Sequence, residues 1–307
     1  MSRPSVYQIF YNYKQLGKLD PAFTPYDNTA NTNPRWREFH VMKQGFEAGL
    51  TERAPYSGWM SWKFGMKIGG RRSAGRKFLN FVQDNPGYDV YFINPFTFTL
   101  ATNWNVWTQG EIAHPGLTAY AKNLLMKAGL NDLDFDEDPQ GHSETCYCNF
   151  WIATPAFWRA FMDFILPIYR YIEDECAPLF SQALWRQAET HTDSAYIPFI
   201  FERLFSVFLR QHPEFRVAGY RYSRREIAEK YNADIHALLD AMDDVKEQYR
   251  REPKPELRNK LDGLAAIAYE LRNKGTMERA RPNYSCKMTF GKWHLAFSAK
   301  RLRRLRE

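Results

Sequence analysis

The sequence predicts an α/β fold followed by a helical, basic extension. Short strands rich in β-branched and aromatic residues alternate with amphipathic helices up to about residue 210, which is typical of an α/β sandwich. Beyond that point two amphipathic helices surround a proline-rich turn. A chain of 307 residues, 44% apolar and 25% charged, has the composition of a globular protein of about two domains. We therefore expect one domain over residues 1–215 and a second over residues 216–307.

Strands and helices alternate in the first predicted domain. Ser5–Tyr11 is β-branched and aromatic with few polar residues, which is typical of a buried strand. Asp89–Asn94 has the pattern of a core strand with a polar residue at each end. The other elements predicted here are a helix over Arg35–Leu50, a strand over Trp59–Phe64, the end of a short helix at Phe78–Val82 and a turn at Asn85–Gly87.

Two more helices complete this domain. Thr154 is suited to cap a helix, and Pro155 suits the first helical position, where its missing N–H costs nothing. Pro167 is expected to kink or end that helix. A second helix begins near Pro198, and the residues that share its apolar face are Leu204, Phe205, Phe208 and Leu209.

The second predicted domain is a helical hairpin with a basic tail. Apolar residues keep a helical period from Ile227 to Val245 and from Leu257 to Leu271, on either side of Glu252–Pro255. Residues 221–307 contain 21 Lys and Arg against 13 Asp and Glu, whereas residues 1–220 contain 21 against 22. The tail Lys292–Arg306 is expected to lie on an anionic membrane surface, a solvated helix being the alternative. No nucleic-acid partner is expected, because the rest of the chain offers no basic track.

Several protein classes lose support because their motifs are missing. The sequence contains no phosphate-binding P-loop, no dinucleotide fingerprint, no H-E-x-x-H and no G-x-S-x-G. Neither a secretory signal nor a membrane span is recognisable, so we expect a cytoplasmic protein. The four cysteines form no disulfide or zinc pattern and are expected to be reduced thiols. Cys146 or Cys148 acting as a nucleophile with a histidine is the less favoured alternative.

Polar residues follow the predicted core strand at Asp89–Asn94. Ligands of α/β proteins bind beyond the carboxyl ends of strands, where Asn94 lies. Glu202 and Arg203 interrupt an apolar helix face, either as an internal ion pair or as a base and a phosphate-binding group. Asp132–Asp138 is expected to be a solvated acidic loop, with a divalent cation on its alternate carboxylates as the alternative. Further polar residues of interest are Asn105, Glu111, His114 and His191–Asp193.

A series of short segments in a fixed order resembles a known family. The segments are Asp27-Asn28, Trp36–Glu38, Tyr56–Phe64, Tyr88–Pro95, Asn105–Glu111, His114–Gly116, Cys148–Trp151 and Pro198–Phe205. Over residues 5–215 they resemble a bacterial family associated with capsule and lipopolysaccharide gene clusters, and more distantly the capsular-polysaccharide glycosyltransferases. The His-Tyr-Arg-Arg element of those enzymes is replaced here by Ser61–Phe64, which leaves Lys63 as the phosphate counter-charge.

The resemblance implies a glycosyltransferase A-like, Rossmann-like fold and transfer from a nucleotide sugar to a growing surface polysaccharide. It implies that Asp27 and Asn28 contact the base or ribose of the donor and that Lys63 contacts its diphosphate. Asp89 and Asn94 would lie near the donor sugar or a manganese or magnesium ion, with Asp89 as the metal ligand.

The resemblance also implies residues for the acceptor side. The candidates for the base, which the sequence does not rank, are Glu111, Asp193 and Glu202. Arg203 is a further candidate for the donor phosphates. The residues implied to bind substrate are Trp62, Asn105, His114 and Asn149. The acceptor would be lipid-linked or a polysaccharide, and the basic tail would hold the enzyme at the inner face of the membrane.

Two rival functions stay open. The missing basic element in Ser61–Phe64 favours a non-catalytic carbohydrate-binding or assembly protein on the same fold. A metal-dependent hydrolase would need clustered carboxylates that bind metal without a nucleotide.

Overall fold

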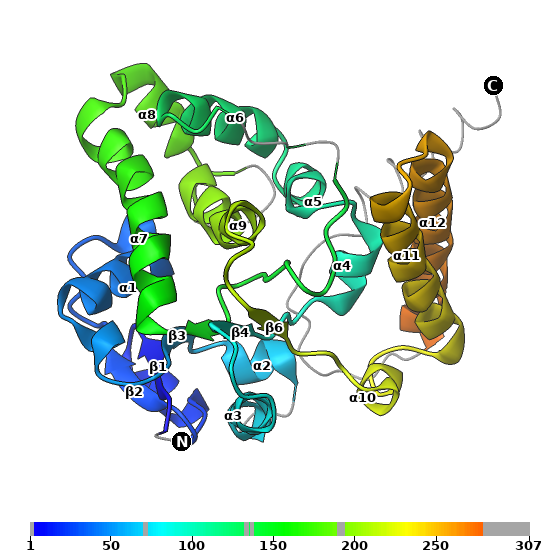
Figure 1. The fold of residues 1–307 in the computed structure, drawn as a ribbon, viewed down its shortest axis with the longest axis horizontal. Coiled ribbons are helices and arrows are strands. Elements are labelled where there is room, and N and C mark those ends of the chain that lie inside the picture. The colour runs from blue at the N-terminus through cyan, green and yellow to red at the C-terminus, as the bar shows by residue number, and fades with distance from the viewer. Residues whose placement is uncertain (1–2, 70–72, 132–134, 136–137, 189–193, 279–307) are drawn as a thin grey trace. The chain divides into compact units, whose positions relative to one another are not determined.

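The computed structural model describes residues 3–69, 73–131, 135, 138–188 and 194–278 (Figure 1). The chain divides into two compact units, Met1–Tyr222 and Ser223–Glu307. The boundary lies beyond residue 215 because strand β6 (Val217–Gly219) pairs with β4 in the sheet of the first unit.

A six-stranded sheet forms the centre of the first unit. Its strands are β1 (Ser5–Phe10), β2 (Thr24–Asp27), β3 (Ser57–Ser61), β4 (Val90–Phe92), β5 (Trp151–Ala153) and β6. Their order is β2-β1-β3-β5-β4-β6. All run in one direction except β5, which is antiparallel to β3 and β4. The mixed α/β class predicted from the sequence is therefore confirmed.

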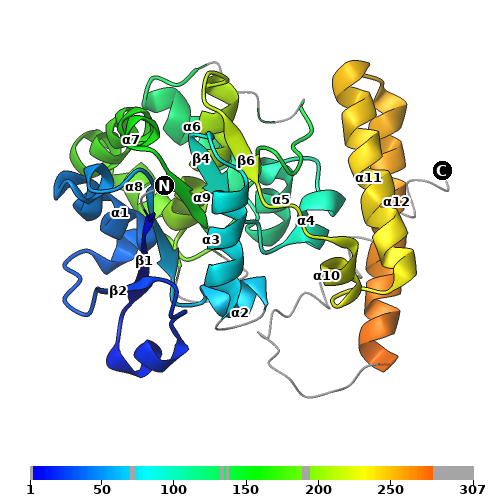
Figure 2. The same cartoon turned by 60° about the horizontal axis from the view of Figure 1, so that its bottom comes forward.

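Helices cover both faces of this sheet (Figures 1 and 2). On one face, Phe81 of α3 meets the ring of Tyr91 in β4 at 6.1 Å. On the other face, Trp151 of β5 stacks on Phe205 of α9 at 4.9 Å and meets Trp158 of α7 at 4.3 Å. Much of the aromatic excess of the sequence therefore packs the core. The helices of this unit are η1 (Tyr13–Lys18), η2 (Pro34–Trp36), α1 (Glu38–Glu47), η3 (Leu50–Glu52), α2 (Phe64–Ile68), α3 (Ala74–Asp84), α4 (Thr97–Thr102), α5 (Val106–Ala113), α6 (Leu117–Lys127), α7 (Pro155–Arg170), η5 (Tyr171–Glu175), α8 (Pro178–Leu184) and α9 (Tyr196–Gln211).

Two predicted elements differ from the structure near the carboxyl ends of the strands. The strand predicted over Trp59–Phe64 is β3, which begins at Ser57 and ends at Ser61, where it pairs with Ile9 of β1. Helix α2 then begins at Phe64. The helix predicted over Arg35–Leu50 is interrupted at Arg37, whose φ of +52° is incompatible with an α-helix. The 3₁₀ turn η2 therefore precedes α1.

The predicted start of α7 is confirmed. The side-chain oxygen of Thr154 accepts a hydrogen bond from the backbone N–H of Phe157 at 3.3 Å, and Pro155 occupies the first turn. Pro167 does not end this helix, which continues to Arg170 and then passes into the π-helical turn η5.

The second unit contains α10 (Arg224–Ala228), α11 (Ala233–Arg251) and α12 (Pro255–Glu278). The two long helices pack against each other as the predicted hairpin. The continuous helix expected from Ile227 to Val245 is instead two helices, because the side chains of Ser223 and Asn232 each cap a separate one. The tail Lys292–Arg306 lies outside the described residues. None of the described helices combines the length and apolar content needed to cross a membrane.

Gly58 tests the pairing of β3 with β5. A Cβ atom at this position would lie 2.3 Å from the backbone oxygen of Trp151. We predict that Gly58→Ala lowers the free energy of unfolding by about 2–3 kcal/mol, because a backbone atom must move to accommodate the methyl group. Denaturant unfolding measures this, with Gly17→Ala as the matched control because nothing lies within 4 Å of a Cβ there. Equal stability of the two variants would contradict this close approach.

Candidate functional site

The strand order brings several polar residues to one edge of the sheet. From β1 the chain passes to β2 on one side and then to β3 on the other. The carboxyl ends of β1 and β3 are therefore a topological switch point, where open α/β sheets bind ligands. Tyr11 follows β1 at this point, and Trp62 and Lys63 follow β3.

Lys67, on α2 directly after β3, is the centre of a charged cluster. Its Nζ donates a hydrogen bond to Sγ of Cys148 at 2.9 Å. Burial by itself lowers the pKa of Lys67, but Cys148 and the carboxylates of Glu202 and Glu38 together raise it above its ordinary value. The ammonium group is therefore charged throughout the physiological pH range. We refer to Glu38, Lys67, Cys148 and Glu202 as the lysine cluster.

The two carboxylates of the lysine cluster come from different helices. Glu38 begins α1 and acts on the loop after β1, where burial and the charge of Glu38 raise the pKa of the Tyr11 hydroxyl. Glu202 lies in the middle of α9, half-buried, and its charge acts on both Lys67 and Cys148. Within the described part of the chain, the Glu202 carboxylate has no hydrogen-bond partner.

Backbone strain is concentrated around the lysine cluster. Among the described residues, the non-glycine positions with positive φ are Arg37 (+52°), Cys148 (+71°) and Asn149 (+53°). Arg37 directly precedes Glu38, and Asn149 directly follows Cys148. Such conformations cost about 1–3 kcal/mol each and cluster at functional sites. The positive φ angles therefore indicate the same region as the charged groups of the lysine cluster, and they are an independent observation.

Asp27 and Asn28 lie at the carboxyl end of β2, next to β1. Asn28 is 5% exposed, and its Nδ2 has no hydrogen-bond acceptor among the described residues. Asp27 is exposed, and the backbone N–H of Thr29 lowers the pKa of its carboxyl group. A buried amide donor without an acceptor requires an explanation, and a ligand oxygen is one.

Two lysines contact the ring of Trp62 beside the lysine cluster. The Nζ atoms of Lys18 and Lys63 lie 5.0 Å and 5.3 Å from its ring centroid. Both lysines are exposed, whereas Trp62 is partly buried. Cation–π contacts of this kind bring the two ammonium groups to the carboxyl ends of β1 and β3.

Arg203 has a structural role, which corrects the expectation that it binds phosphate. Arg203 is only 2% exposed. It donates from Nε to the backbone oxygen of Val106 at 2.9 Å, from Nη1 to that of Phe199 at 2.7 Å, and from Nη2 to the side chain of Gln109. The guanidinium group fixes α5 to α9 and is enclosed by the protein.

Asn105, Glu111 and His114 also stabilise helices rather than form part of the lysine cluster. Asn105 caps α5, and its Nδ2 donates to the backbone oxygen of Phe135 at 3.0 Å. The carboxylate of Glu111 accepts from the backbone N–H groups of Gly116 at 2.7 Å and Thr118 at 3.0 Å, which caps α6. His114 is 4% exposed, and its ring centroid lies 3.6 Å from that of Phe199.

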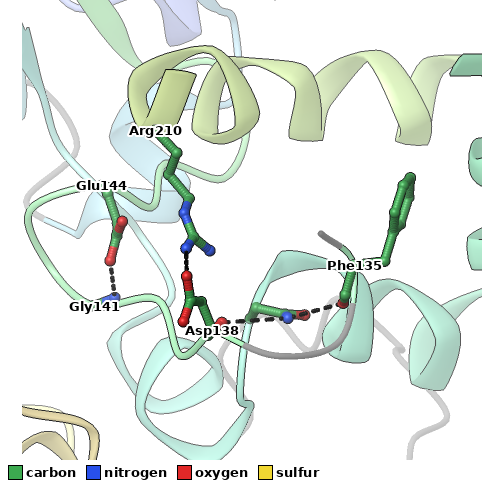
Figure 3. Close-up of polar contacts among 6 residues, drawn as sticks. Phe135, Asp138, Gly141, Glu144 and Arg210 are labelled. Atoms are coloured by element: carbon green, nitrogen blue, oxygen red, sulfur yellow. Dashed lines mark hydrogen bonds and ion pairs between the residues drawn. The ribbon is translucent and has the colours of Figure 1, made fainter. Parts of the chain in front are cut away.

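The segment around Asp138 is held against α9 (Figure 3). The carboxylate of Asp138 forms an ion pair with Arg210, and Glu144 accepts from the backbone N–H of Gly141 at 3.1 Å. Asp138 therefore serves as a partner of α9. The other carboxylates of the predicted acidic run lie outside the described residues, as do His191 and Asp193.

Asp89 does not lie near the site where the resemblance implied it. It precedes β4, at the amino end of this strand, and its Oδ2 accepts from the backbone N–H of Arg216 at 2.8 Å. Asn94 lies at the carboxyl end, but its Nδ2 donates to the backbone oxygen of Thr145 at 3.2 Å and its Oδ1 accepts from Phe96 at 3.0 Å. Among the described residues no three His, Cys, Asp or Glu side chains are grouped to hold a metal. A manganese or magnesium site built on Asp89 does not fit them.

Sequence reasoning missed Glu38 and Lys67. Glu38 was present in the segment Trp36–Glu38, one of those that carry the resemblance, but nothing in its neighbours assigns it a role. Lys67 lies four residues after Lys63, so a helix that begins at Phe64 brings the two lysines to neighbouring turns. The prediction of a strand through Phe64 concealed this relation.

Two shallow surface pockets lie away from the lysine cluster. One, of about 390 Å³, lies beside β6 and is lined in part by Tyr88, His142 and Arg221. The other, of about 250 Å³, lies between Arg3 and Arg76. Neither combines charges with strained backbone, so we place the candidate site at the lysine cluster.

Comparison with known proteins gives a distant structural likeness. No protein-family model matches this chain, and no curated protein matches it significantly. A solved structure of the bifunctional glycosyltransferase WbbM in its apo form is similar over 70% of this chain, with 16% sequence identity and a TM-score of 0.41. The similar region spans 44% of that chain. We base no functional assignment on a likeness this distant.

The reactivity of Cys148 tests the environment of the lysine cluster. Burial raises the pKa of the Cys148 thiol to about 12, against the lowering effect of Lys67, and burial also raises that of Cys146. Both groups are therefore protonated thiols at pH 8, and only the thiolate is nucleophilic. We predict that iodoacetamide at pH 8 alkylates both cysteines much more slowly in the folded protein than in the unfolded one, measured by peptide mass spectrometry. Equal rates at Cys148 would contradict the raised pKa of its thiol and revive the cysteine-nucleophile alternative.

Proposed function

We propose that this chain is a nucleotide-sugar-dependent glycosyltransferase that adds a sugar to a growing surface polysaccharide, such as capsule, O-antigen or exopolysaccharide. The observation that carries the proposal is the lysine cluster at the switch point of the sheet, where the Lys67 ammonium group contacts Cys148 and its pKa is raised by the charges of Glu202 and Glu38. Glycosyl transfer needs cationic groups at the leaving diphosphate and a carboxylate near the acceptor hydroxyl. The lysine cluster supplies both types of group.

Lys67 and Lys63 bind the donor diphosphate in this proposal. Negative charge accumulates on the diphosphate oxygen as its bond to the anomeric carbon breaks, and a fixed ammonium group stabilises that charge. Lys67 suits this role because its raised pKa keeps it charged and its contact with Cys148 holds it in place. Lys63 is exposed beside it and can adjust to the ligand.

Glu202 is the proposed base. Its carboxylate has no hydrogen-bond partner among the described residues. In this proposal it accepts the proton of the acceptor hydroxyl as that oxygen attacks the anomeric carbon. Glu38 is instead the carboxylate whose charge raises the pKa of both the Tyr11 hydroxyl and Lys67. Glu111 is occupied as a helix cap.

Asp27, Asn28 and Asn149 are proposed to contact the nucleoside and the donor sugar. The buried Nδ2 of Asn28 suits an acceptor oxygen of the base or ribose, and the exposed carboxylate of Asp27 suits ribose hydroxyls. No step is assigned to a divalent cation, because the described residues do not fit one. We propose that the enzyme acts in the cytoplasm, at the inner face of the membrane, on a lipid-linked or polysaccharide acceptor.

A non-catalytic carbohydrate-binding or assembly protein is the second candidate. It is favoured by the segment Ser61–Phe64, in which Ser61 is 6% exposed and Lys63 is the one basic residue. Trp62 is partly exposed, and an aromatic ring of this kind packs against a sugar. A pure binder would show carbohydrate affinity without turnover.

Nucleotide binding tests the role of Lys67. We predict that one class among UDP-, GDP-, CMP- and dTDP-linked sugars raises the melting temperature of the protein without added manganese. A ligand at one hundred times its Kd stabilises the folded state by about 2.7 kcal/mol. Lys67→Met should remove most of this shift, whereas Lys122→Met, an exposed lysine of α6, should retain it. A shift that survives Lys67→Met unchanged would contradict the placement of the diphosphate.

Turnover tests the role of Glu202. We predict that Glu202→Gln lowers the rate of sugar transfer to lipid-linked or polysaccharide acceptors by about 100-fold or more while donor binding is kept. Glu111→Gln is the matched control, because its carboxylate is outside the lysine cluster, and it should retain transfer. Radiolabelled donor measures both. A Glu202→Gln variant as active as Glu111→Gln would exclude Glu202 as the base, and wild-type carbohydrate binding without any transfer would favour the second candidate.

A further inference from the structure

A strip of exposed apolar and basic side chains borders the lysine cluster. It comes from residues 11–19, which contain η1, and residues 61–69, which contain α2. These segments leave the carboxyl ends of β1 and β3, and the contact of Lys18 with Trp62 at 5.0 Å joins them. We refer to the large exposed side chains of the strip, apart from Lys63 of the candidate site, as the basic rim, which comprises Tyr13, Lys14, Leu16, Lys18 and Met66.

The apolar members of the basic rim are unusually exposed. Tyr13 is 67% exposed, Leu16 42% and Met66 52%. Each is a large side chain whose exposure to water is unfavourable, and all three lie on short helical turns beside the candidate site. Their grouping at one edge of the sheet indicates a surface that is covered when the protein works.

The charge of the basic rim is of one sign. The rim contributes Lys14 and Lys18, and residues 11–19 and 61–69 contain no Asp or Glu. Asp27 is the neighbouring carboxylate, and it accepts a hydrogen bond from the hydroxyl of Tyr13 at 3.4 Å. By contrast Leu179 on α8, which is 82% exposed, follows the acidic run Glu173–Glu175.

Exposed apolar side chains interspersed with lysines suit the surface of an anionic bilayer. The apolar groups enter the boundary between headgroups and acyl chains, while the lysine stems reach outward and their ammonium groups meet lipid phosphates. We propose that the basic rim docks the first unit onto an anionic phospholipid surface, independently of the C-terminal tail. This goes beyond the proposed function, because it places the lysine cluster next to the bilayer, where a lipid-carried acceptor would be presented.

Vesicle binding by the full-length protein tests this proposal without any donor or turnover, so its failure is separate from a failure of the proposed function. Vesicles of phosphatidylcholine alone are compared with vesicles that contain one quarter phosphatidylglycerol, by co-sedimentation. We expect binding to the anionic vesicles that falls as salt is raised, and little binding to the neutral ones. Absence of binding to the anionic vesicles would overturn the proposal.

Variants locate the surface that binds. The double variant Lys14→Ala/Lys18→Ala should lower the partition coefficient about fivefold per lysine. The double variant Leu16→Ser/Met66→Ser should lower it by about tenfold in total. Leu179→Ser is the matched apolar control and should bind as the wild type does, with circular dichroism confirming that each variant is folded. If both double variants bind vesicles as the wild type does, and removal of residues 292–307 abolishes vesicle binding, the membrane contact belongs to the tail. That result would overturn the proposal.

Discussion

The ammonium group of Lys67 connects segments that are far apart in the sequence. It donates to Cys148 in the loop before β5 and is balanced by Glu38 at the start of α1 and by Glu202 on α9. Removing this charge from water costs free energy, which the hydrogen bond to Cys148 and the charges of Glu202 and Glu38 offset. Two of the residues with positive φ lie at this place: Arg37 directly precedes Glu38, and Cys148 carries the sulfur that Lys67 contacts.

The rest of the first unit holds this arrangement in place. Arg203 fixes α9 to α5 through backbone oxygens, and Glu111 closes the turn between α5 and α6. Trp151 and Phe205 pack α9 onto the sheet, so Glu202 is presented from a rigid helix rather than from a loop. Groups positioned by rigid elements need little reorganisation when a ligand binds, which is what electrostatic catalysis requires.

The sequence predicts the framework of this structure better than its site. Strand β1, the start of α7 and the helical hairpin follow from β-branched and aromatic runs, a Thr-Pro cap and amphipathic periodicity, all of which are local signals. Lys67 and Glu38 were missed because their meeting depends on Arg37 leaving helical geometry and on β3 ending at Ser61. Asn105 and Glu111 were expected in the site because they follow a strand end, and Arg203 because it interrupts an apolar helix face. Such a polar residue has the same appearance in the sequence whether its partner is a ligand or the protein's own backbone. Only the fold supplies that partner.

Hydrogen–deuterium exchange with and without a panel of nucleoside diphosphates tests most directly whether the lysine cluster is the ligand site. Lys67, Cys148 and the residues after β1 lie on peptides that cover residues 11–18, 61–68 and 145–150, which are three separate segments of the chain. We predict that one diphosphate slows exchange in all three together and leaves the peptides of α11 unchanged. Slower exchange confined to residues 217–221, beside the pocket at β6, or no change with any member of the panel, would contradict the account.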